Sequence, residues 1–596
     1  QGEGDLRMQN PYWIAYRNLR LNNKKRYMAS AGLSYQILDW LNVAGRVRID
    51  NTHSEYEGKL YASSSNTLTD GSTQGHYTVN NGQYSQTYAD VLVNINKRIQ
   101  DFTIVANIGA SYSGVTSKEL GYAGPIRETG IPNLFNVYDL DNAKKRATQV
   151  GWREATESVF ASAEVGWKSM LYLTVTGRND WASQLTHSPQ ASFFYPSVGL
   201  SAVITEMLKL PDWVDYLKVR GSFSSVGNPY PRFLTYPTYS YDANKQDWKS
   251  QTNYPIGKLY PERTDSWEIG LDATLFKDFK LSGSFYYANT YNQTFDPRLP
   301  VSSGYDKLYV QTGYVRNYGF EAMLSYGHRW GDFSWDSSFT FSANKNEIVE
   351  LVKDYVHPET GKTYNVDKLE LKTDEGRGFG KAKFILKEGG TLGDLYTHAD
   401  LKRDINGNIL IDDSGNVTAI DNAGDIKLGS VLPKANLAWN NSFSYKGINA
   451  GFLLTARLGG IVYSATQAYL DLYGVSETSA AARDAGGVWV NGRSRVNPQS
   501  FYEVVASQSG LPTYYTYSAT NLRLQEAHIG YTIPRRWLGN VCDINVSLVG
   551  RNLWMIYCKA PFDPEAVATT NNYYQGIDYF MMPSTRNIGF NIKINF

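Results

Sequence analysis

Cysteine is almost absent from this chain of 596 residues, because Cys542 and Cys558 are its only two cysteines. Two cysteines exclude the disulfide framework that holds many small extracellular folds together. An excess of charge of one sign is lacking too, since 58 basic residues balance 57 acidic ones to a formal net charge of +1. A chain without a strongly basic surface is poorly suited to nucleic acid, and we expect no such partner.

Long apolar runs and enzyme motifs are missing as well. The mean hydropathy is −0.41, and no stretch has the length and apolar character of a transmembrane helix. The opening residues QGEGDLRMQN lack the basic start and the apolar core of a signal peptide. The seven histidines are scattered without zinc-ligand spacing, and no nucleophile elbow of the form G-x-S-x-G occurs. We therefore predict no catalytic site and no enzymatic activity.

Aromatic residues, at 14%, and glycines, at 52, are abundant, and apolar residues recur at every second position along most of the chain. Residues 27–35 and 267–275 are two examples of this alternation. It is the pattern of a β-strand with one apolar and one polar face. About 17 such segments follow one another, most of them near the roughly 9–11 residues that a tilted membrane strand needs.

The connections between these segments alternate between short and long. Short turns, such as Lys168-Ser169 and Lys446-Gly447, join strands in pairs. Between the pairs lie long polar stretches, of which the largest are residues 50–86, 113–156, 226–265, 343–432 and 460–519. Short turns on one rim and long loops on the other are typical of an outer-membrane barrel. We predict an all-β fold, a transmembrane antiparallel β-barrel with short periplasmic turns and long extracellular loops.

The two faces of the predicted strands support this fold over a soluble β-sandwich. Apolar faces would meet lipid, while polar faces, which carry Arg46, Arg48, Lys218, Arg220, Glu268 and Asp272, would line a wet interior. Tryptophans near strand ends, including Trp40, Trp167, Trp267, Trp330 and Trp439, suit the interfacial girdles of such a barrel, although aromatics are also ordinary strand formers. A soluble sandwich of this length would need several domains, and no linker composition separates blocks of the chain.

The chain ends on an alternating strand with an aromatic last residue. The apolar positions are Phe590, Ile592, Ile594 and Phe596. Bacterial outer-membrane barrels end in the same way, and we predict that these four residues form the barrel-assembly signal. The strand count is odd, whereas bacterial single-chain barrels have even numbers. The first strand also starts on the loop side, so we expect an odd number of N-terminal strands to be missing from 1–596.

The order of several stretches along the chain resembles one known family. These stretches are LYLTVTGRNDWAS (171–183), FFYPSVGLSAVITE (193–206), YLKVRGSFSSVGN (216–228), ERTDSWEIGLDATLF (262–276), VRNYGFEAML (315–324), GDIKLGSVLPKANLAWNNSFSYKG (424–447), NLRLQEAHIGYTIPRRW (521–537), LVGRNLW (548–554) and FDPEA (562–566). Their collinear order is similar to that of the SusC/RagA family, the TonB-dependent transporters of the outer membrane of Bacteroidota. No single stretch decides this resemblance.

The resemblance implies a barrel of about 22 strands around an N-terminal plug, so that about five strands, the plug and the TonB box lie outside this chain. It implies a SusD-like surface lipoprotein as a lid, the TonB complex as the energy source and, often, a dimer of transporter–lipoprotein pairs. The implied function is import of oligosaccharides. Oligopeptide import by the same family is the alternative, and a passive porin or a structural or adhesion barrel is a further one.

Two loops carry the aromatic residues that could stack on a sugar. The candidates are Tyr236, Tyr239, Tyr241 and Trp248 in one loop and Tyr514 and Tyr515 in another. The competing interpretation is that these side chains pack loop against loop, because large loops need small cores of their own. The preference for carbohydrate over peptide follows from the family alone.

Three further segments depart from the strand pattern. The loop 401–425 offers Asp404, Asn406, Asn408 and Asp412 as oxygen ligands for a structural calcium ion, although its Asn-Gly and Ser-Gly pairs also read as tight turns. No other cofactor is expected. Residues 464–486 have helical periodicity interrupted by Gly474. The alternation over 522–533 shifts by one residue, which predicts a β-bulge.

Overall fold

The structure is a computed structural model. It describes residues 10–595 except 235–238, 243–246, 250–252, 255–258, 296–306, 309, 357–360, 362, 372–379 and 569–574. Tyr236 and Phe596, both predicted as functional residues, therefore lie outside the described residues. Within the described part of the chain, no helix has the length and apolar character needed to cross a bilayer.

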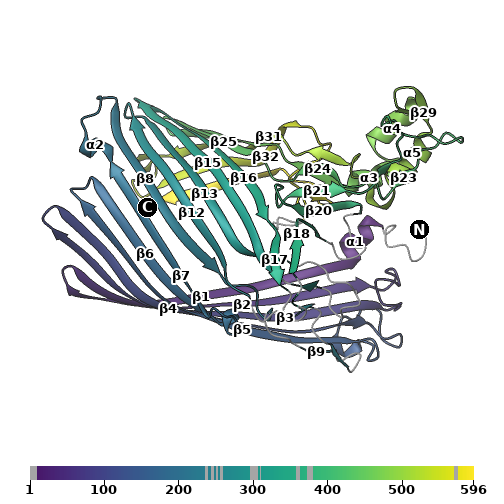
Figure 1. Ribbon diagram of the computed structural model, residues 1–596, viewed down its shortest axis with the longest axis horizontal. Coiled ribbons are helices and arrows are strands. Elements are labelled where there is room, and N and C mark those ends of the chain that lie inside the picture. Colours follow the sequence, from purple (N-terminus) through teal and green to yellow (C-terminus); the bar gives the residue numbers. More distant parts are fainter. Residues whose placement is uncertain are drawn as a thin grey trace.

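One antiparallel sheet of 17 strands dominates the molecule, as Figure 1 shows, and each strand pairs with the next sheet strand along the chain. The strands are β1 (Asn18–Leu38), β2 (Leu41–Tyr61), β3 (Gly75–Ile99), β4 (Phe102–Pro125), β5 (Arg146–Trp167), β6 (Leu171–Ala182), β7 (Ser192–Val203), β8 (Val214–Asn228), β12 (Glu262–Leu275), β13 (Phe279–Phe295), β15 (Val310–Trp330), β16 (Phe333–Glu350), β25 (Ala435–Tyr445), β26 (Ile448–Leu458), β31 (Asn521–Ile533), β32 (Asp543–Cys558) and β34 (Asn587–Asn595). The all-β prediction and the strand number are confirmed.

Tight turns join these strands at one end. Gly331 and Lys446 adopt left-handed backbone angles in two of these turns, with φ of 60° and 47°. Figure 1 places the C-terminus and the short helix α2 (Ile204–Met207) at this end and the long connections at the other. β1 and β34 are the two edges of the sheet, and no pairing joins them among the described residues.

Two of the predicted long loops are much shorter than expected. The stretch 50–86 consists mostly of strand, because β2 continues to Tyr61 and β3 begins at Gly75, and 113–156 is divided in the same way between β4 and β5. Above the membrane a strand faces water and needs no apolar face, because backbone hydrogen bonds to the neighbouring strands are sufficient to hold it in the sheet. The alternation that reveals strands in the sequence is therefore lost there. The sheet strands run from 9 to 25 residues rather than staying near membrane length.

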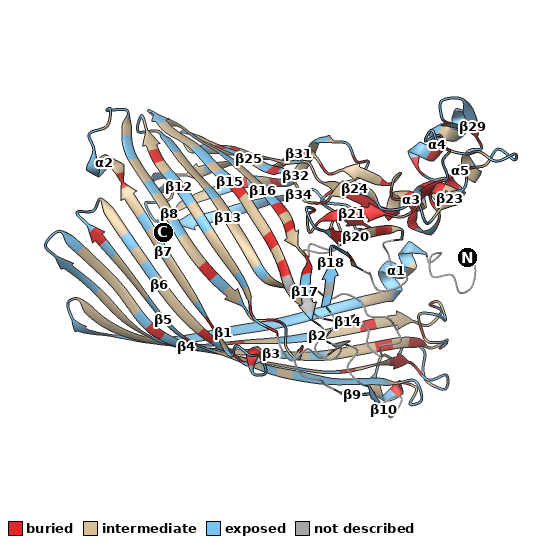
Figure 2. Cartoon of the chain, viewed as in Figure 1, coloured by how far each residue is buried: buried red, intermediate tan, exposed pale blue. Residues whose placement is uncertain are grey.

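The long connections on either side of β25 and β26 form a compact extracellular unit, here called the cap (residues 380–432 and 460–519, with β33). Its strands are β20 (Ala382–Lys387), β21 (Asp394–Thr397), β22 (Asp400–Leu401), β23 (Ala419–Ile420), β24 (Ile426–Ser430), β27 (Ile461–Ser464), β28 (Val488–Val490), β29 (Ser494–Val496), β30 (Thr516–Ser518) and β33 (Ile577–Asp578), with β19 (Lys368–Leu371) extending the first of its sheets. Its helices are α3 (Ala465–Leu472), α4 (Glu477–Asp484) and α5 (Pro498–Val505). Figure 2 shows its buried residues gathered away from the barrel wall.

The predicted helical segment 464–486 is confirmed as α3 and α4. Gly474, with φ of 67°, separates the two helices. Ser464 and Ser476 cap them by accepting hydrogen bonds from the backbone N–H groups of Gln467 and Ser479.

The remaining elements are small. They are α1 (Pro11–Arg17), β9 (Ser240–Asp242), β10 (Asp247–Lys249), β11 (Asn253–Tyr254), β14 (Lys307–Leu308), β17 (Val352–Val356), β18 (Thr363–Val366) and the 3-10 turns Val137–Asp139, Ser183–Leu185, Ser507–Ser509 and Arg535–Trp537. β9 pairs with β10 as an antiparallel hairpin in the loop between β8 and β12.

Candidate functional site: the polar barrel face and the extracellular loops

The sheet has one apolar and one polar face, as the sequence predicts. The register places Trp267 of β12 opposite Phe223 of β8 and Tyr287 of β13 on the apolar face. Trp267 is 59% exposed and its neighbour Ile269 is 64% exposed. Large apolar side chains left open in a row are explained by contact with lipid, so this face is the outer surface of the barrel.

Ion pairs between neighbouring strands line the polar face. Arg46 of β2 binds Asp90 of β3 at 2.8 Å, and Arg220 of β8 binds Asp272 of β12 at 2.6 Å. Asp90 is only 3% exposed. The guanidinium of Arg48 lies over the ring of Tyr88, 5.6 Å from its centroid. The prediction that these charges face the interior is confirmed, and their pairing satisfies carboxylates that the sheet partly removes from water.

The polar face is hollowed along β8, β13, β15, β16, β25, β26 and β31. The hollow has a volume of about 730 Å³. Its polar lining consists of hydroxyl, amide and charged groups, including Arg220, Ser282, Glu321, Asn436 and Arg457. Side chains of this kind can form hydrogen bonds with a hydrophilic solute. The rest of the lining is apolar and includes Met323, Phe341 and Leu437.

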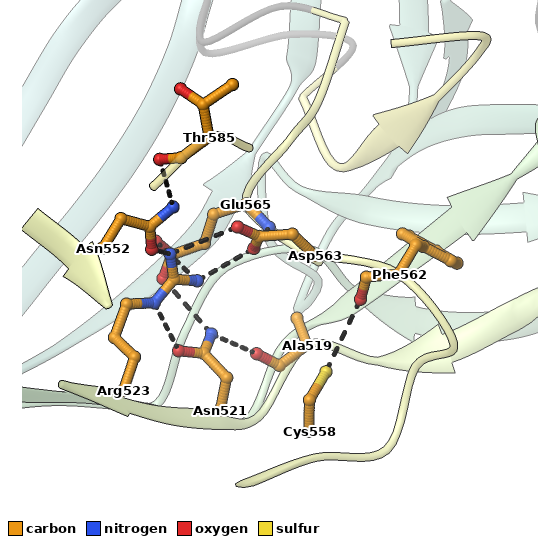
Figure 3. Close-up of polar contacts among 9 residues, drawn as sticks. All are labelled: Ala519, Asn521, Arg523, Asn552, Cys558, Phe562, Asp563, Glu565 and Thr585. Carbon is orange, nitrogen blue, oxygen red and sulfur yellow. Dashed lines mark hydrogen bonds and ion pairs between the residues drawn. The ribbon is translucent and has the colours of Figure 1, made fainter. Parts of the chain in front are cut away.

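A buried arginine contacts Glu565, one of the residues that line this hollow. The side chain of Arg523, on β31, is 7% exposed and reaches the connection between β32 and β34 (Figure 3). Its two terminal nitrogens donate to both carboxylate oxygens of Asp563, at 2.8 and 3.2 Å. A nitrogen of the same guanidinium lies 3.2 Å from Glu565, which itself borders the hollow.

Two asparagines complete this arginine cluster. Asn521 accepts from the Nε of Arg523 at 3.3 Å and donates to the carbonyl oxygen of Ala519 at 3.1 Å. Asn552 donates to the carbonyl oxygen of Thr585 at 3.2 Å. Figure 3 shows these groups converging from β31, β32 and the following connection. The cluster thus ties the last long loop to the barrel wall.

The predicted β-bulge lies at Gln525, two residues after this arginine, because adjacent Leu453 and Leu454 of β26 pair with Glu526 and Leu524. The pairing of β31 with β32 shifts between Leu522 and Arg523 and again between Leu524 and Glu526. A bulge twists a strand and turns a side chain away from its regular direction. The bulge prediction for 522–533 is therefore confirmed, and the irregular pairing lies next to the arginine that anchors the loop.

Electrostatics favour the charged form of Asp563. Burial alone would raise the pKa of this carboxyl, but hydrogen bonds from Arg523 and from the backbone N–H of Glu565 outweigh burial and lower the pKa below its ordinary value. The pair is therefore ionised under all ordinary conditions.

Tyr514 and Tyr515 lie in the cap. Tyr515 is 2% exposed, and its hydroxyl donates to Asp471 at 3.0 Å inside the cap core. Tyr514 is partly buried and packs edge-to-face against Phe501, with ring centroids 6.2 Å apart. In this structure both residues help to build the loop core, which is the competing interpretation that the sequence left open.

Tyr239, Tyr241 and Trp248 have the opposite environment. Tyr241 on β9 and Trp248 on β10 are cross-strand neighbours whose ring centroids are 5.2 Å apart. Trp248 is 65% and Tyr239 67% exposed. The structure therefore brings together two of the predicted substrate-binding residues as an accessible aromatic pair on an extracellular hairpin.

The acidic loop 401–425 folds as two successive turns. Asp404 accepts hydrogen bonds from the backbone N–H groups of Asn406 and Asn408, and Asp412 accepts from those of Ser414 and Asn416. The hydrogen bonds from Asn408 lower the pKa of Asp404. Among the described residues, no group of three or more His, Cys, Asp or Glu side chains could hold a metal ion. A calcium site that also uses Asn and backbone oxygens stays a prediction.

The C-terminal strand continues the apolar face. Phe590, Ile592 and Ile594 lie opposite Leu548, Val546 and Ile544 of β32, and all three are exposed. Their place at the edge of the sheet is that expected of a terminal barrel strand, while their role as an assembly signal stays a prediction.

Comparison with known proteins identifies the family. Residues 3–553 match the family model described as TonB dependent receptor-like, beta-barrel. This chain belongs to that family. It is a barrel of the outer membrane, consistent with the SusC/RagA type.

Individual relatives agree with this assignment. TonB-dependent receptor P3 of Formosa agariphila is 23% identical over 98% of this chain and 60% of its own length. TonB-dependent receptor SusC of Bacteroides thetaiotaomicron is 24% identical over 67% of this chain and 40% of its own length. The RagAB peptide transporter shares the fold, with a TM-score of 0.74 and 17% identity over 98% of this chain and 63% of that one. The chain thus spans less than two thirds of each of these proteins.

The arginine cluster was not predicted from the sequence. Arg523 and Asp563 lie in two of the stretches that resemble the family, but 40 residues separate them in the sequence. The usable signal is a basic residue at a change of strand phase, followed after the next strand by two acidic residues in a loop.

Proposed function

We propose that this chain is the barrel of an energised importer that carries oligosaccharides across the bacterial outer membrane. The observation that carries the proposal is the hollow on the polar face, whose lining offers hydroxyl, amide and charged groups inside a barrel of this family. Sugar hydroxyls need such donors and acceptors, and the exposed Tyr241–Trp248 pair offers aromatic faces on which sugar rings can stack at the extracellular entrance.

The proposed cycle needs no chemical step by the barrel. The solute is captured at the extracellular loops by this chain together with a SusD-like lipoprotein lid. It then passes along the polar face, where hydrogen bonds replace those it made to water. The TonB complex supplies the energy by pulling on a plug domain of the whole protein. A dimer of transporter–lipoprotein pairs is the proposed assembly.

An oligopeptide is the second candidate cargo. It is supported by the likeness of this fold to the RagAB peptide transporter. A peptide would use the same amide and hydroxyl groups but would draw more on the fixed charges, such as Arg220 and Glu321 at the hollow. The two candidate cargoes can therefore be distinguished by the chemical identity of the ligand that stays bound to the protein.

Purification from native outer membranes in mild detergent, followed by mass spectrometry of every bound component, tests the proposal. We expect a SusD-like lipoprotein, plug peptides and a bound oligosaccharide. A bound oligopeptide in place of the sugar would transfer the function to the second candidate. A barrel without a plug and without a lipoprotein would contradict import and favour a passive porin or a structural barrel.

A further inference from the structure

A charged and aromatic patch interrupts the apolar face of the barrel at its extracellular end. The patch, here called the outer patch, lies on β12, β13, β15 and β16 and consists of Arg263, Asp265, Tyr287, Tyr291, Tyr314, Arg316, Tyr318, Lys345 and Glu347. It was not predicted, because the sequence alternation there places charges where apolar residues are expected.

The strand register fixes the side on which the patch lies. Trp267, Tyr287, Tyr318 and Lys345 form one row across the four strands. Trp267 belongs to the lipid-facing side, so the other members of the row do too. The next row toward the long loops contains Asp265, Arg316 and Glu347, which therefore also point outward.

Two of the three cations of the outer patch, Arg316 and Lys345, are held against tyrosine rings, while Arg263 pairs with Asp265 at 2.8 Å. The guanidinium of Arg316 lies 5.6 Å from the ring centroid of Tyr287 and 5.5 Å from that of Tyr314. It also donates to the hydroxyl of Tyr314 at 2.9 Å, while Glu347 is 3.7 Å away. The Nε of Arg316 is buried and has no hydrogen-bond partner among the described residues. The ammonium of Lys345 lies 5.5 Å from the ring centroid of Tyr318.

The height of the patch coincides with the upper boundary of the apolar belt. Ile269, Phe285 and Phe320 form the exposed row directly below the row of Trp267. Two strand residues span about 7 Å, so the charges begin within one or two rows of the last lipid-facing side chains. This is the layer occupied by the headgroups of outer-leaflet lipids.

We propose that the outer patch binds the phosphorylated sugar headgroup of an outer-leaflet glycolipid. Arg263, Arg316 and Lys345 outnumber Asp265 and Glu347 by three to two, which leaves a net positive charge for a phosphate. The tyrosine faces provide stacking surfaces for the sugar rings that carry the phosphate. The patch is continuous with the lipid-contacting surface below it, so one molecule can place its chains on the belt and its headgroup on the patch. This inference depends on the membrane location and not on the transported solute.

The test compares two matched double variants of the full-length protein in its native outer membrane. Arg316→Gln with Lys345→Gln removes two cations from the outer patch. Lys118→Gln with Arg153→Gln removes two exposed cations from β4 and β5, on the same outward face but farther above the belt. Each protein is extracted in mild detergent, and phosphorylated glycolipid per barrel is measured by native mass spectrometry. Folding is checked by the heat-dependent migration of the barrel in gels.

We expect the outer-patch variant to retain on the order of tenfold less glycolipid than the wild type, and the control variant to retain the wild-type amount. Equal retention by all three proteins would overturn the proposal. Unchanged glycolipid with a loss of oligomer would also overturn it, since the patch would then be an interface between copies. If the double variant does not fold, Lys345→Gln alone, at an exposed position, gives the same comparison against Lys118→Gln.

Discussion

Arg523 on β31 and Asp563 in the connection between β32 and β34 form a bidentate ion pair, with nitrogen–oxygen distances of 2.8 and 3.2 Å. Both side chains are more than nine-tenths buried. The other end of the same connection pairs with the cap, because Ser464 of β27 donates to Asp578 of β33 at 2.5 Å. One loop therefore joins the barrel wall to the extracellular cap, and the ion pair is its attachment to the wall.

Replacing the arginine should detach this loop. We expect Arg523→Gln to destabilise the attachment by about 3–5 kcal/mol, because it leaves a buried carboxylate without its cation. Hydrogen exchange of residues 559–568 should rise while exchange of the other barrel strands stays unchanged.

Arg551→Gln is the matched control for this change. Its partner Glu526 is 3.0 Å away, but both side chains are substantially exposed. An exposed pair contributes at most about 1 kcal/mol, so exchange of the loop should stay at the wild-type level. Equal effects of the two variants would show that burial of the Arg523 pair does not hold the loop.

The attachment should depend on pH only in strong acid. The pKa of Asp563 is lower in the folded protein than its ordinary value of 3.8. The ion pair therefore stabilises the loop attachment fully above pH 3.8, and this stabilisation is lost as the pH falls through the folded pKa. Proteolysis of the loop with an acid-stable protease should stay constant from pH 7 to pH 5 and increase below pH 4. The variant Asp563→Asn should remove the dependence of proteolysis on pH. If proteolysis of this variant still increased below pH 4, another titratable group would be responsible.

Tyr515 should matter for the stability of the cap. We expect Tyr515→Ala to destabilise the cap by about 3–5 kcal/mol through the cavity that it leaves. Tyr515→Phe keeps the ring and loses only the hydrogen bond to Asp471, which costs about 1 kcal/mol. Limited proteolysis of the cap measures both effects. If Tyr515→Ala altered solute binding while the cap kept its wild-type resistance, Tyr515 would be a binding residue as the sequence first suggested.

Trp248 should matter for binding and not for stability. Because it is exposed and its ring packs at a tilt against Tyr241, we expect Trp248→Ala to weaken oligosaccharide binding about threefold to tenfold, the value of one aromatic contact. Calorimetric titration of the purified complex measures this change. Trp489→Ala removes another exposed extracellular tryptophan and serves as the control. Equal affinities for the wild type and both variants would remove the hairpin from the binding site.

The sequence predicts the membrane part of this fold well, because lipid on one side and water on the other impose alternation. Strands such as 267–275, the bulge at 522–533 and the helices within 464–486 follow from that pattern and from local capping. The extension of β2 to Tyr61 does not, since a strand above the membrane needs no apolar face. Contacts between segments that are distant in the sequence do not follow from the alternation pattern either.

The candidate site was also predicted only in part from the sequence. Tyr241 and Trp248 were predicted as binding residues because they are aromatic and lie in a long polar loop. In the structure they are cross-strand neighbours on a hairpin. Tyr515 has the same composition around it, yet it is buried by residues of α3 and α5 that the sequence alone does not bring together. The outer patch and the Arg523 cluster depend on the register of neighbouring strands. A shift of one residue would place either on the opposite face.

Uptake of a fluorescently labelled oligosaccharide by cells that express the full-length protein with its lipoprotein partner distinguishes energised import from passive passage. Uptake should be lost when TonB is deleted, while the barrel remains at its normal level in the outer membrane. Uptake that continues at the same rate without TonB would contradict energised import and show that the barrel is a passive channel.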